Sequence, residues 1–250
     1  MEYILRTSNE RYTLITPNLN TMKEIKATDK ESKRINVFLR DAGIGSRRSI
    51  DKYIENNQVS INGKPATLGS KVEHNDIVAV KTVEKDLVYA LYHKPRNEVT
   101  GRLDSLPGCE PLGRLDKESE GLLLYSNDYR VVDALLNPKF AREKEYDVVI
   151  REKATPRVVT LLKKGITTQE AIYAPVKAVT IYNEGYSLKI ILTEGKKHEI
   201  RRMLNALNLT VVSLKRVRIM SFVIHGLKSK SVHILSDKQV ATLLHDCGIK

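Results

Sequence analysis

The chain has 250 residues, of which 41% are hydrophobic and 29% charged, enough for one sizeable domain and a smaller one with buried cores. Lys and Arg number 42 against 30 Asp and Glu, and the resulting net charge of +12 favours a polyanionic partner. No apolar run approaches the ~20 residues of a membrane span, and no long basic amphipathic stretch appears, so we expect nucleic acid rather than a membrane.

Residues 1–33 are expected to be an N-terminal extension. Apolar segments on either side of the polar stretch Arg6–Arg11 favour a hairpin there. The charged segment Lys23–Lys33 has little apolar periodicity and is typical of a linker. The amino terminus lacks the continuous apolar stretch of a signal peptide, and Met22 stands as an alternative start.

Residues 34–80 have the pattern of a small domain. Apolar residues within 35–42 recur at i, i+3, i+4 and i+7, which predicts a short helix. Ser46 is the expected N-cap of a second helix. The segments 59–63 and 76–80 alternate in the manner of strands.

Five basic residues gather around the turn and the second helix of this small domain. Taken alone, such a cluster is more typical of a solvated face than of a binding surface. The run from Arg34 to Lys64, however, resembles the S4 RNA-binding domain, of the αL type, along its whole length. One position departs from that family, since Asn57 stands where Gly is usual, but Asn enters the left-handed region at tolerable cost. The resemblance implies that RNA phosphates are neutralised by Arg40, Arg47, Arg48, Lys52 and Lys64.

Residues 81–86 are expected to connect this domain to a larger one over 87–244, with 245–250 as a tail. The larger part mixes strand patterns at 87–92, 121–126, 146–151 and 187–193 with helical spacing at 131–136, 157–164 and 200–207. Strands mixed with helices, without regular strand–helix–strand repeats, predict an α+β fold rather than a doubly wound sheet.

The segment 111–124 holds the most informative pattern, in which Arg114 and Asp116 follow a turn at Gly113. If this segment is extended, the two side chains share one face while Leu115 points into the core. A carboxylate then lies beside a cation on a rigid element, as catalysis requires. In isolation, a surface salt bridge at a strand end explains such a pair better.

The sequence GRLDKESEGLLLYSND, starting at Gly113, resembles the central motif of the pseudouridine synthases of the small-subunit and large-subunit rRNA class. In that family the Asp of the motif is the catalytic carboxylate, which falls on Asp116. The resemblance also implies a mixed, mainly antiparallel β-sheet with flanking helices. A second Gly-Arg-Leu-Asp ends at Asp104 and is followed by turn-forming residues, so we interpret Asp104 as structural.

Glu143–Val148 resembles the Lys-x-Tyr-x-Val strand of the same family, which implies that Tyr146 stacks on the flipped uracil. Without that context, a tyrosine in a strand is usually half-buried packing.

Glu194–Met203 resembles the family's Glu-Gly-x-x-x-Gln-Ile-Arg-Arg-Met motif, in which Arg201 is the paired arginine and Ile200 an apolar contact near the base. Glu199 replaces the usual Gln, so any hydrogen bond made by that amide is expected to change. Downstream, Leu214–Met220 resembles the large-subunit synthase of type F.

The reaction that the resemblance implies breaks the N1–C1′ bond of a uridine, turns the uracil and joins its C5 to the same carbon. The carboxylate acts at the sugar, and we expect Arg201 to hold Asp116 ionised. The nucleotide must be extruded first, and Arg114 is expected to fill the vacated space or brace the backbone.

This chemistry needs no cofactor and no metal, and the sequence has no metal-ligand cluster or nucleotide-binding glycine motif. The two cysteines, Cys109 and Cys247, are far apart without metal-ligand spacing, which is typical of a reducing compartment. We therefore expect a cytoplasmic enzyme of rRNA and tRNA processing, active as a monomer and bound to RNA.

Two other functions stay open. A non-catalytic RNA-binding protein would be expected to lack Asp116, Tyr146 or Arg201, and a nuclease or glycosidase would release a fragment or a free base. The resemblance to type F implies a uridine in 23S (large-subunit) rRNA, with an anticodon uridine of tyrosine tRNA as a second substrate. A 16S (small-subunit) rRNA target is the alternative, and the short loop 96–112 is expected to affect target choice rather than chemistry.

Overall fold

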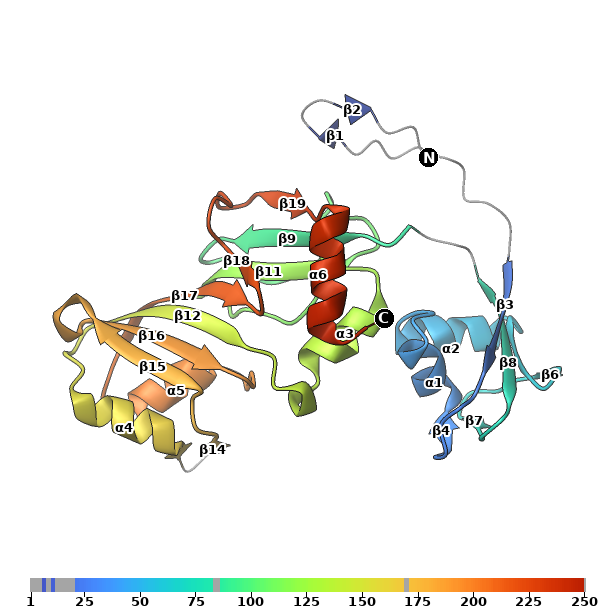
Figure 1. Cartoon of the computed structure of the whole chain (residues 1–250), viewed down its shortest axis with the longest axis horizontal. Helices are drawn as coiled ribbons and strands as arrows, with labels where there is room; N and C mark the ends of the chain where they lie inside the picture. Colours follow the sequence, from blue (N-terminus) through green and yellow to red (C-terminus); the bar gives the residue numbers. More distant parts are fainter. Residues whose placement is uncertain (1–5, 8–9, 12–20, 83–85, 169–170, 250) are drawn as a thin grey trace. The chain divides into compact units, whose positions relative to one another are not determined.

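The computed structural model forms two compact units (Figure 1), the first from residues 1–88 and 127–133 and the second from 89–126 and 134–250. Every helix in the part of the chain that the structure describes is too short or too polar to cross a lipid bilayer. The described residues are 6–7, 10–11, 21–82, 86–168 and 171–249.

The strands of the amino-terminal hairpin lie closer to the turn than the sequence predicts. Strands β1 (Arg6–Thr7) and β2 (Glu10–Arg11) pair antiparallel inside the polar stretch that was expected to form only the turn. The apolar segments predicted on either side lie outside the described residues.

The two helices of the small unit confirm the predicted pattern. They are α1 (Ile35–Asp41), in which Ile35, Phe38 and Leu39 are buried while Ala42 is its half-buried C-cap, and α2 (Arg47–Glu55). Ser46 Oγ accepts a hydrogen bond from Ser49 N at 3.1 Å, which confirms Ser46 as the N-cap of α2. Asn57 follows α2 with φ of 54°, the left-handed conformation that an Asn tolerates.

These helices share a core with a four-stranded antiparallel sheet in the order β3-β8-β5-β6. Two short strands, β4 (Lys33–Arg34) and β7 (Lys71–Val72), pair separately. The sheet strands are β3 (Thr21–Lys26), β5 (Val59–Ile61), β6 (Lys64–Pro65) and β8 (Ile77–Thr82).

Strand β3 differs from the linker predicted for Lys23–Lys33. It pairs with β8 over its whole length, from Thr21 against Thr82 to Lys26 against Ile77. Ile25 packs against the core while its charged neighbours stay exposed. An edge strand with one inward apolar side chain has too weak an alternation to be found by pattern alone.

The large unit contains a nine-stranded sheet with the main order β15-β16-β12-β17-β11-β9-β19, to which β10 adds on β11 and β18 on β17. Only the pair β11–β17 is parallel among the pairings of this sheet within the described ranges, so the predicted mixed, mainly antiparallel sheet is confirmed. The strands are β9 (Tyr89–Lys94), β10 (Glu110–Pro111), β11 (Glu120–Ser126), β12 (Lys144–Ile150), β15 (Ala178–Tyr182), β16 (Ser187–Leu192), β17 (Val211–Ile219), β18 (Phe222–Val223) and β19 (Val232–Ile234).

A separate pair, β13 (Ile166–Thr167) and β14 (Ile172–Tyr173), lies in the segment that follows the fourth helix. The helices are α3 (Tyr129–Leu136), α4 (Pro156–Lys164), α5 (Glu199–Asn205) and α6 (Asp237–Cys247), with short 3₁₀ turns at Pro138–Phe140 and Asn183–Gly185.

The first three of these helices lie close to the predicted ranges, whereas α6 was not predicted and extends beyond residue 244. Its start carries a sequence signal, since Ser236 and Gln239 form a capping box in which Gln239 Oε1 accepts from Ser236 N at 2.9 Å.

Gly121 allows the two central strands of the large sheet to approach each other. It has φ of 121°, and a Cβ there would lie 2.6 Å from Arg216 N, on the paired residue of β17. Only glycine fits such a position, since any side chain would collide with backbone. The close pairing brings the start of β11, and hence the loop that precedes it, next to Arg216.

Candidate active site

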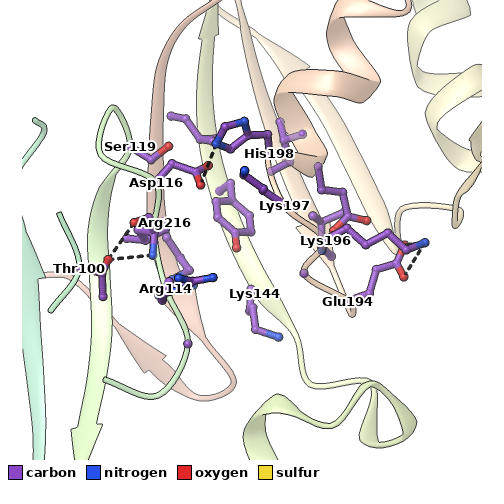
Figure 2. Close-up of a pocket in the computed structure, with 18 of the residues that line it drawn as sticks. Thr100, Arg114, Asp116, Ser119, Lys144, Glu194, Lys196, Lys197, His198 and Arg216 are labelled. Carbon is purple, nitrogen blue, oxygen red and sulfur yellow. Dashed lines mark hydrogen bonds and ion pairs between the residues drawn. The ribbon is translucent and has the colours of Figure 1, made fainter. Parts of the chain in front are cut away.

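A pocket of about 620 Å³ opens in the large unit, and the three motif segments of the sequence meet in its walls (Figure 2). One wall is the loop around 113–119, which connects β10 to β11. A second comes from β12 and β17, and a third from the turn 192–200 between β16 and α5. Segments that are far apart in sequence therefore surround one cavity.

Asp116 stands on the loop between β10 and β11 with its side chain 33% exposed. Thr100 holds the residue before it, because its Oγ1 donates to Leu115 O at 2.8 Å and accepts from Leu115 N at 3.0 Å. Leu115 is buried and Arg114 is exposed, and all three residues from Arg114 to Asp116 line the pocket, in a segment that is irregular rather than a strand. A loop fixed at both backbone groups keeps the carboxylate in one place.

His198 is the direct partner of Asp116, since its Nε2 lies 3.2 Å from Asp116 Oδ1 (Figure 2). It precedes α5 in the left-handed conformation, with φ of 55°. That conformation costs a non-glycine residue about 1–2 kcal/mol, so neighbouring contacts must hold it. The sequence motifs do not predict a role for His198. It lies inside the Glu194–Met203 motif, but a role for it required the folded geometry.

Glu199 closes the turn that carries His198. Lys196 N donates to Glu199 Oε2 at 2.8 Å, and Glu199 N donates to Lys196 O at 3.2 Å. The Glu199 side chain is buried, and its Oε1 has no hydrogen-bond partner among the described groups. Burial, together with the nearby carboxyl of Glu194, raises the pKa of Glu199 to about 7.

Arg201 does not contact Asp116 as the sequence analysis expects. Its Nη2 lies 3.4 Å from both Glu118 O and Ser119 Oγ, and its Nη1 lies 4.0 Å from Glu118 Oε2. The tight turn before α5 directs position 201 toward the residues that follow Asp116 rather than toward its carboxylate. Arg201 thus contacts the loop after Asp116, and His198 rather than Arg201 contacts the Asp116 carboxylate.

Tyr146 and Ile200 are both buried and both line the pocket. The aromatic ring and the aliphatic side chain expected beside the uracil therefore share the cavity with Asp116. Lys144, two residues before Tyr146 on β12, also lines the pocket and donates to Arg142 O at 3.3 Å. Burial, with a contribution from the cation of Arg216, lowers the pKa of Lys144 to about 8.

Arg216 is a pocket residue to which sequence analysis assigned no role. Its side chain is buried, and its Nε donates to Leu122 O at 2.7 Å. Its Nη2 is buried without a hydrogen-bond partner among the described residues. A buried donor of this kind is available to a bound molecule.

A second hollow, of about 290 Å³, lies on the other side of His198. We call it the basic groove, because three of its residues carry cationic or protonatable groups. It is lined by His198, Arg201, Arg202, Asn205, Leu209, Thr210 and Val211. The groove and the pocket share His198, whose Nε2 contacts Asp116 Oδ1.

The small unit keeps four of its five predicted RNA-binding cations exposed, namely Arg47, Arg48, Lys52 and Lys64. Arg40 is half-buried instead, and its Nη2 pairs with Asp41 Oδ1 at 2.6 Å. Asp104 lies in an exposed turn and does not line the pocket. Within the described ranges, no three His, Cys, Asp or Glu side chains are arranged to hold a metal ion.

Known proteins share both parts of this architecture. The family model described as RNA pseudouridylate synthase matches residues 58–206, and the S4 domain model matches residues 33–78. A solved structure described as a crystal structure of pseudouridylate synthase has a TM-score of 0.63 and 23% sequence identity, covering 84% of this chain and 99% of its own.

Three curated proteins illustrate the similarity in sequence. The dual-specificity RNA pseudouridine synthase RluF of Escherichia coli K12 is 30% identical over 230 residues, which cover 85% of this chain and 78% of that protein. The ribosomal large subunit pseudouridine synthase B of Bacillus subtilis is 28% identical over 232 residues, with coverage of 84% and 95%. An uncharacterized RNA pseudouridine synthase of Borreliella burgdorferi is 30% identical over 235 residues, with coverage of 85% and 94%.

Proposed function

The chain belongs to the RNA pseudouridylate synthase family, and on that premise we propose that it uses Asp116 to isomerise a uridine of large-subunit rRNA. The observation that carries this proposal is the convergence of Asp116, Tyr146 and Ile200 on one pocket of about 620 Å³. A carboxylate, an aromatic ring and an aliphatic wall are the groups that an extruded uridine needs.

In the proposed reaction, the N1–C1′ bond breaks, the uracil turns, and C5 joins C1′. The proton at C5 leaves and N1 gains one, so the mass of the RNA does not change. Asp116, partly exposed, faces the sugar, while the more deeply buried Tyr146 and Ile200 hold the base between them. The unpartnered Nη2 of Arg216 is a donor for a uracil carbonyl.

Two neighbours of Asp116 prepare it for this step. His198 holds the carboxylate in one orientation through the contact between Nε2 and Oδ1. Arg114 is exposed at the pocket and fills the space that the extruded nucleotide leaves in the RNA. The base that removes the C5 proton is one of the pocket groups or water.

The RNA is held by the exposed cations of the S4 domain and by the basic groove. The S4 domain presents Arg and Lys side chains and the groove presents Arg201 and Arg202, and such cations neutralise phosphates without selecting sequence. The Bacillus subtilis relative is named for the large ribosomal subunit, which supports 23S rRNA as the substrate. The Escherichia coli relative is named for dual specificity, which supports a second RNA, and we propose tyrosine tRNA. We further propose that the enzyme acts as a monomer in the cytoplasm.

The test is release of tritium from RNA labelled at uracil C5, with 23S rRNA, 16S rRNA and tRNA assayed separately. The RNA comes from cells that lack this protein, so that the target uridine is unmodified. Wild type is compared with Asp116→Asn and with Asp104→Asn, the carboxylate of the second Gly-Arg-Leu-Asp. Release from 23S rRNA by wild type and Asp104→Asn but not by Asp116→Asn supports the proposal. Release from 16S rRNA alone would make the small-subunit rRNA the target. RNA binding without any release would support a non-catalytic RNA-binding protein.

A further inference from the structure

The carboxyl groups of Glu194, in the turn after β16, and Glu199, at the start of α5, lie close enough to interact, and the isomerisation itself uses neither. Glu199 Oε2 accepts from Lys196 N at 2.8 Å. Glu194 Oε1 accepts from Ala174 N at 3.1 Å and lies 3.3 Å from Lys196 Nζ. The pair therefore joins the end of β16 to the start of α5, on one wall of the pocket.

The surroundings of Glu199 favour its protonated form. Its Oε1 is buried and accepts no hydrogen bond from any described group, which is costly for an ionised carboxylate. A proton on Glu199 that is shared with Glu194 removes that cost and adds a hydrogen bond. Burial first, and then the Glu194 carboxyl, raise the pKa of Glu199.

The charged and titratable groups around Glu199 come from three elements. Its own turn contributes Glu194, Lys196 and His198, of which Glu194 favours the neutral form and Lys196 the ionised form. From β12, Lys144 interacts with Glu199 across the pocket, and Arg216 of β17 acts on Lys144 in turn. Burial and Glu194 outweigh Lys196 in the net direction.

The shape of this turn decides where His198 points. The two hydrogen bonds between Lys196 and Glu199 close a ring around His198, whose φ of 55° requires such support. His198 in turn contacts Asp116 at 3.2 Å. A continuous set of contacts therefore runs from the carboxyl pair, through the turn, to the proposed catalytic carboxylate.

We propose that Glu199 acts in its protonated form as a positioning residue, which shares its proton with Glu194 and so holds the turn that presents His198 to Asp116. This inference rests on the proposed role of Asp116. When Glu199 ionises, the two carboxylates repel each other and the bond between them is lost. Turnover then falls as the pH rises through the titration of Glu199.

The decisive variant is Glu199→Gln, because Gln keeps an acceptor for Lys196 N and offers its amide group to Glu194, as the protonated acid does. Wild-type kcat/KM for tritium release is expected to fall about tenfold per pH unit once Glu199 ionises, above about pH 7. The kcat/KM of Glu199→Gln is expected to stay constant over the same pH range. Glu199→Ala is expected to be slow at every pH while still binding RNA, and the exposed Glu184→Gln should follow wild type.

The variant Glu194→Gln provides a second, independent test. Removal of the neighbouring carboxylate lowers the pKa of Glu199, so the fall in kcat/KM is expected to move to lower pH. Identical pH profiles for wild type and Glu199→Gln would overturn the inference.

Thermal unfolding at several pH values tests the protonation state of Glu199 without an activity assay. The advantage in Tm of Glu199→Gln over wild type is expected to grow from about pH 4.5 to about pH 7 and then level. An advantage that does not change with pH overturns the inference as well. If wild type releases no tritium from any RNA at any pH, the proposed function fails and the positioning role fails with it.

Discussion

Asp116 and His198 lie on segments far apart in the chain, yet Asp116 Oδ1 and His198 Nε2 are 3.2 Å apart in the folded protein. The side chains are 33% and 42% exposed, so the contact itself adds little to stability. Its significance is geometric, because it joins the loop after β10 to the turn before α5. The role of this contact, and of those that support it, can be tested by substitution.

Replacement of His198 by Asn is expected to lower kcat for tritium release about tenfold to a hundredfold, with a small change in KM. Asn tolerates the left-handed conformation that His198 adopts, so the turn survives while the contact with Asp116 is lost. Tritium-release kinetics measure the effect, and the exposed His225→Asn is the control. Wild-type kcat in the His198→Asn variant would show that the contact is unimportant.

Thr100→Val is expected to destabilise the protein by about 1–3 kcal/mol, because Leu115 loses both its acceptor and its donor. It is also expected to lower kcat, since the loop that carries Asp116 becomes free to move. Urea denaturation and tritium release measure the two effects. Thr100→Ser keeps the hydroxyl and should stay close to wild type in both measurements, whereas losses as large as those of Thr100→Val would contradict the role of the hydroxyl.

Gly121→Ala is expected to cost more than about 3 kcal/mol or to prevent folding, because its Cβ would collide with the backbone of Arg216. Gly108 has a φ of 79°, but a Cβ at that position would meet no described atom within 4 Å, so Gly108→Ala tests conformational strain alone. That control is expected to cost only about 1–2 kcal/mol. Equal losses in the free energy of unfolding for Gly121→Ala and Gly108→Ala, measured in guanidinium, would contradict a collision at Gly121.

Arg202→Ala is expected to weaken RNA binding and to reduce the slope of log K against log salt by about one. Such a change identifies a phosphate contact in the basic groove. Binding is measured by titration at several salt concentrations, with Lys238→Ala on the exposed face of α6 as the control. An unchanged slope with weaker binding would place Arg202 in a structural role instead.

Lys144→Met is expected to stabilise the protein at pH 7 by on the order of 1 kcal/mol. Burial lowers the pKa of Lys144 to about 8 in the folded state, from its ordinary value of 10.5. The unfolded chain therefore binds more protons between about pH 8 and pH 10.5, and wild-type stability rises with pH in that window. The advantage of Lys144→Met should accordingly shrink across it, as followed by urea denaturation at fixed ionic strength. A constant advantage would indicate that Lys144 is solvated.

Local sequence patterns predict the helices and the cap of the small unit, because these depend on residues near one another in the chain. The spacing of apolar residues and the cap at Ser46 located α1 and α2, and Leu115 is buried as predicted. The resemblance of three short motifs to one family selected Arg114, Asp116, Tyr146 and Ile200, which the fold brings to one pocket, whereas Arg201 lines the basic groove instead.

Contacts made by the folded chain were less accessible to sequence reasoning. Strand β3 has one inward apolar residue, Ile25, and exists because β8 pairs with it. The partner of Asp116 depends on the left-handed turn at His198, which rotates Arg201 away toward Ser119. The unpartnered Nη2 of Arg216 becomes visible only once the side chain is buried in the folded chain. The capping box formed by Ser236 and Gln239 is a local sequence signal that predicts the start of α6.

The pairing of β11 with β17 also has a consequence for synthesis on the ribosome. Gly121 pairs with Arg216, so the centre of the large sheet joins strands separated by most of that unit's length. The small unit's sheet, by contrast, is complete once β8 ends at Thr82. Because contacts distant in sequence form late, we expect the S4 sheet to fold co-translationally while the nascent chain still lacks a catalytic pocket. An RNA-binding surface would then exist before the enzyme does.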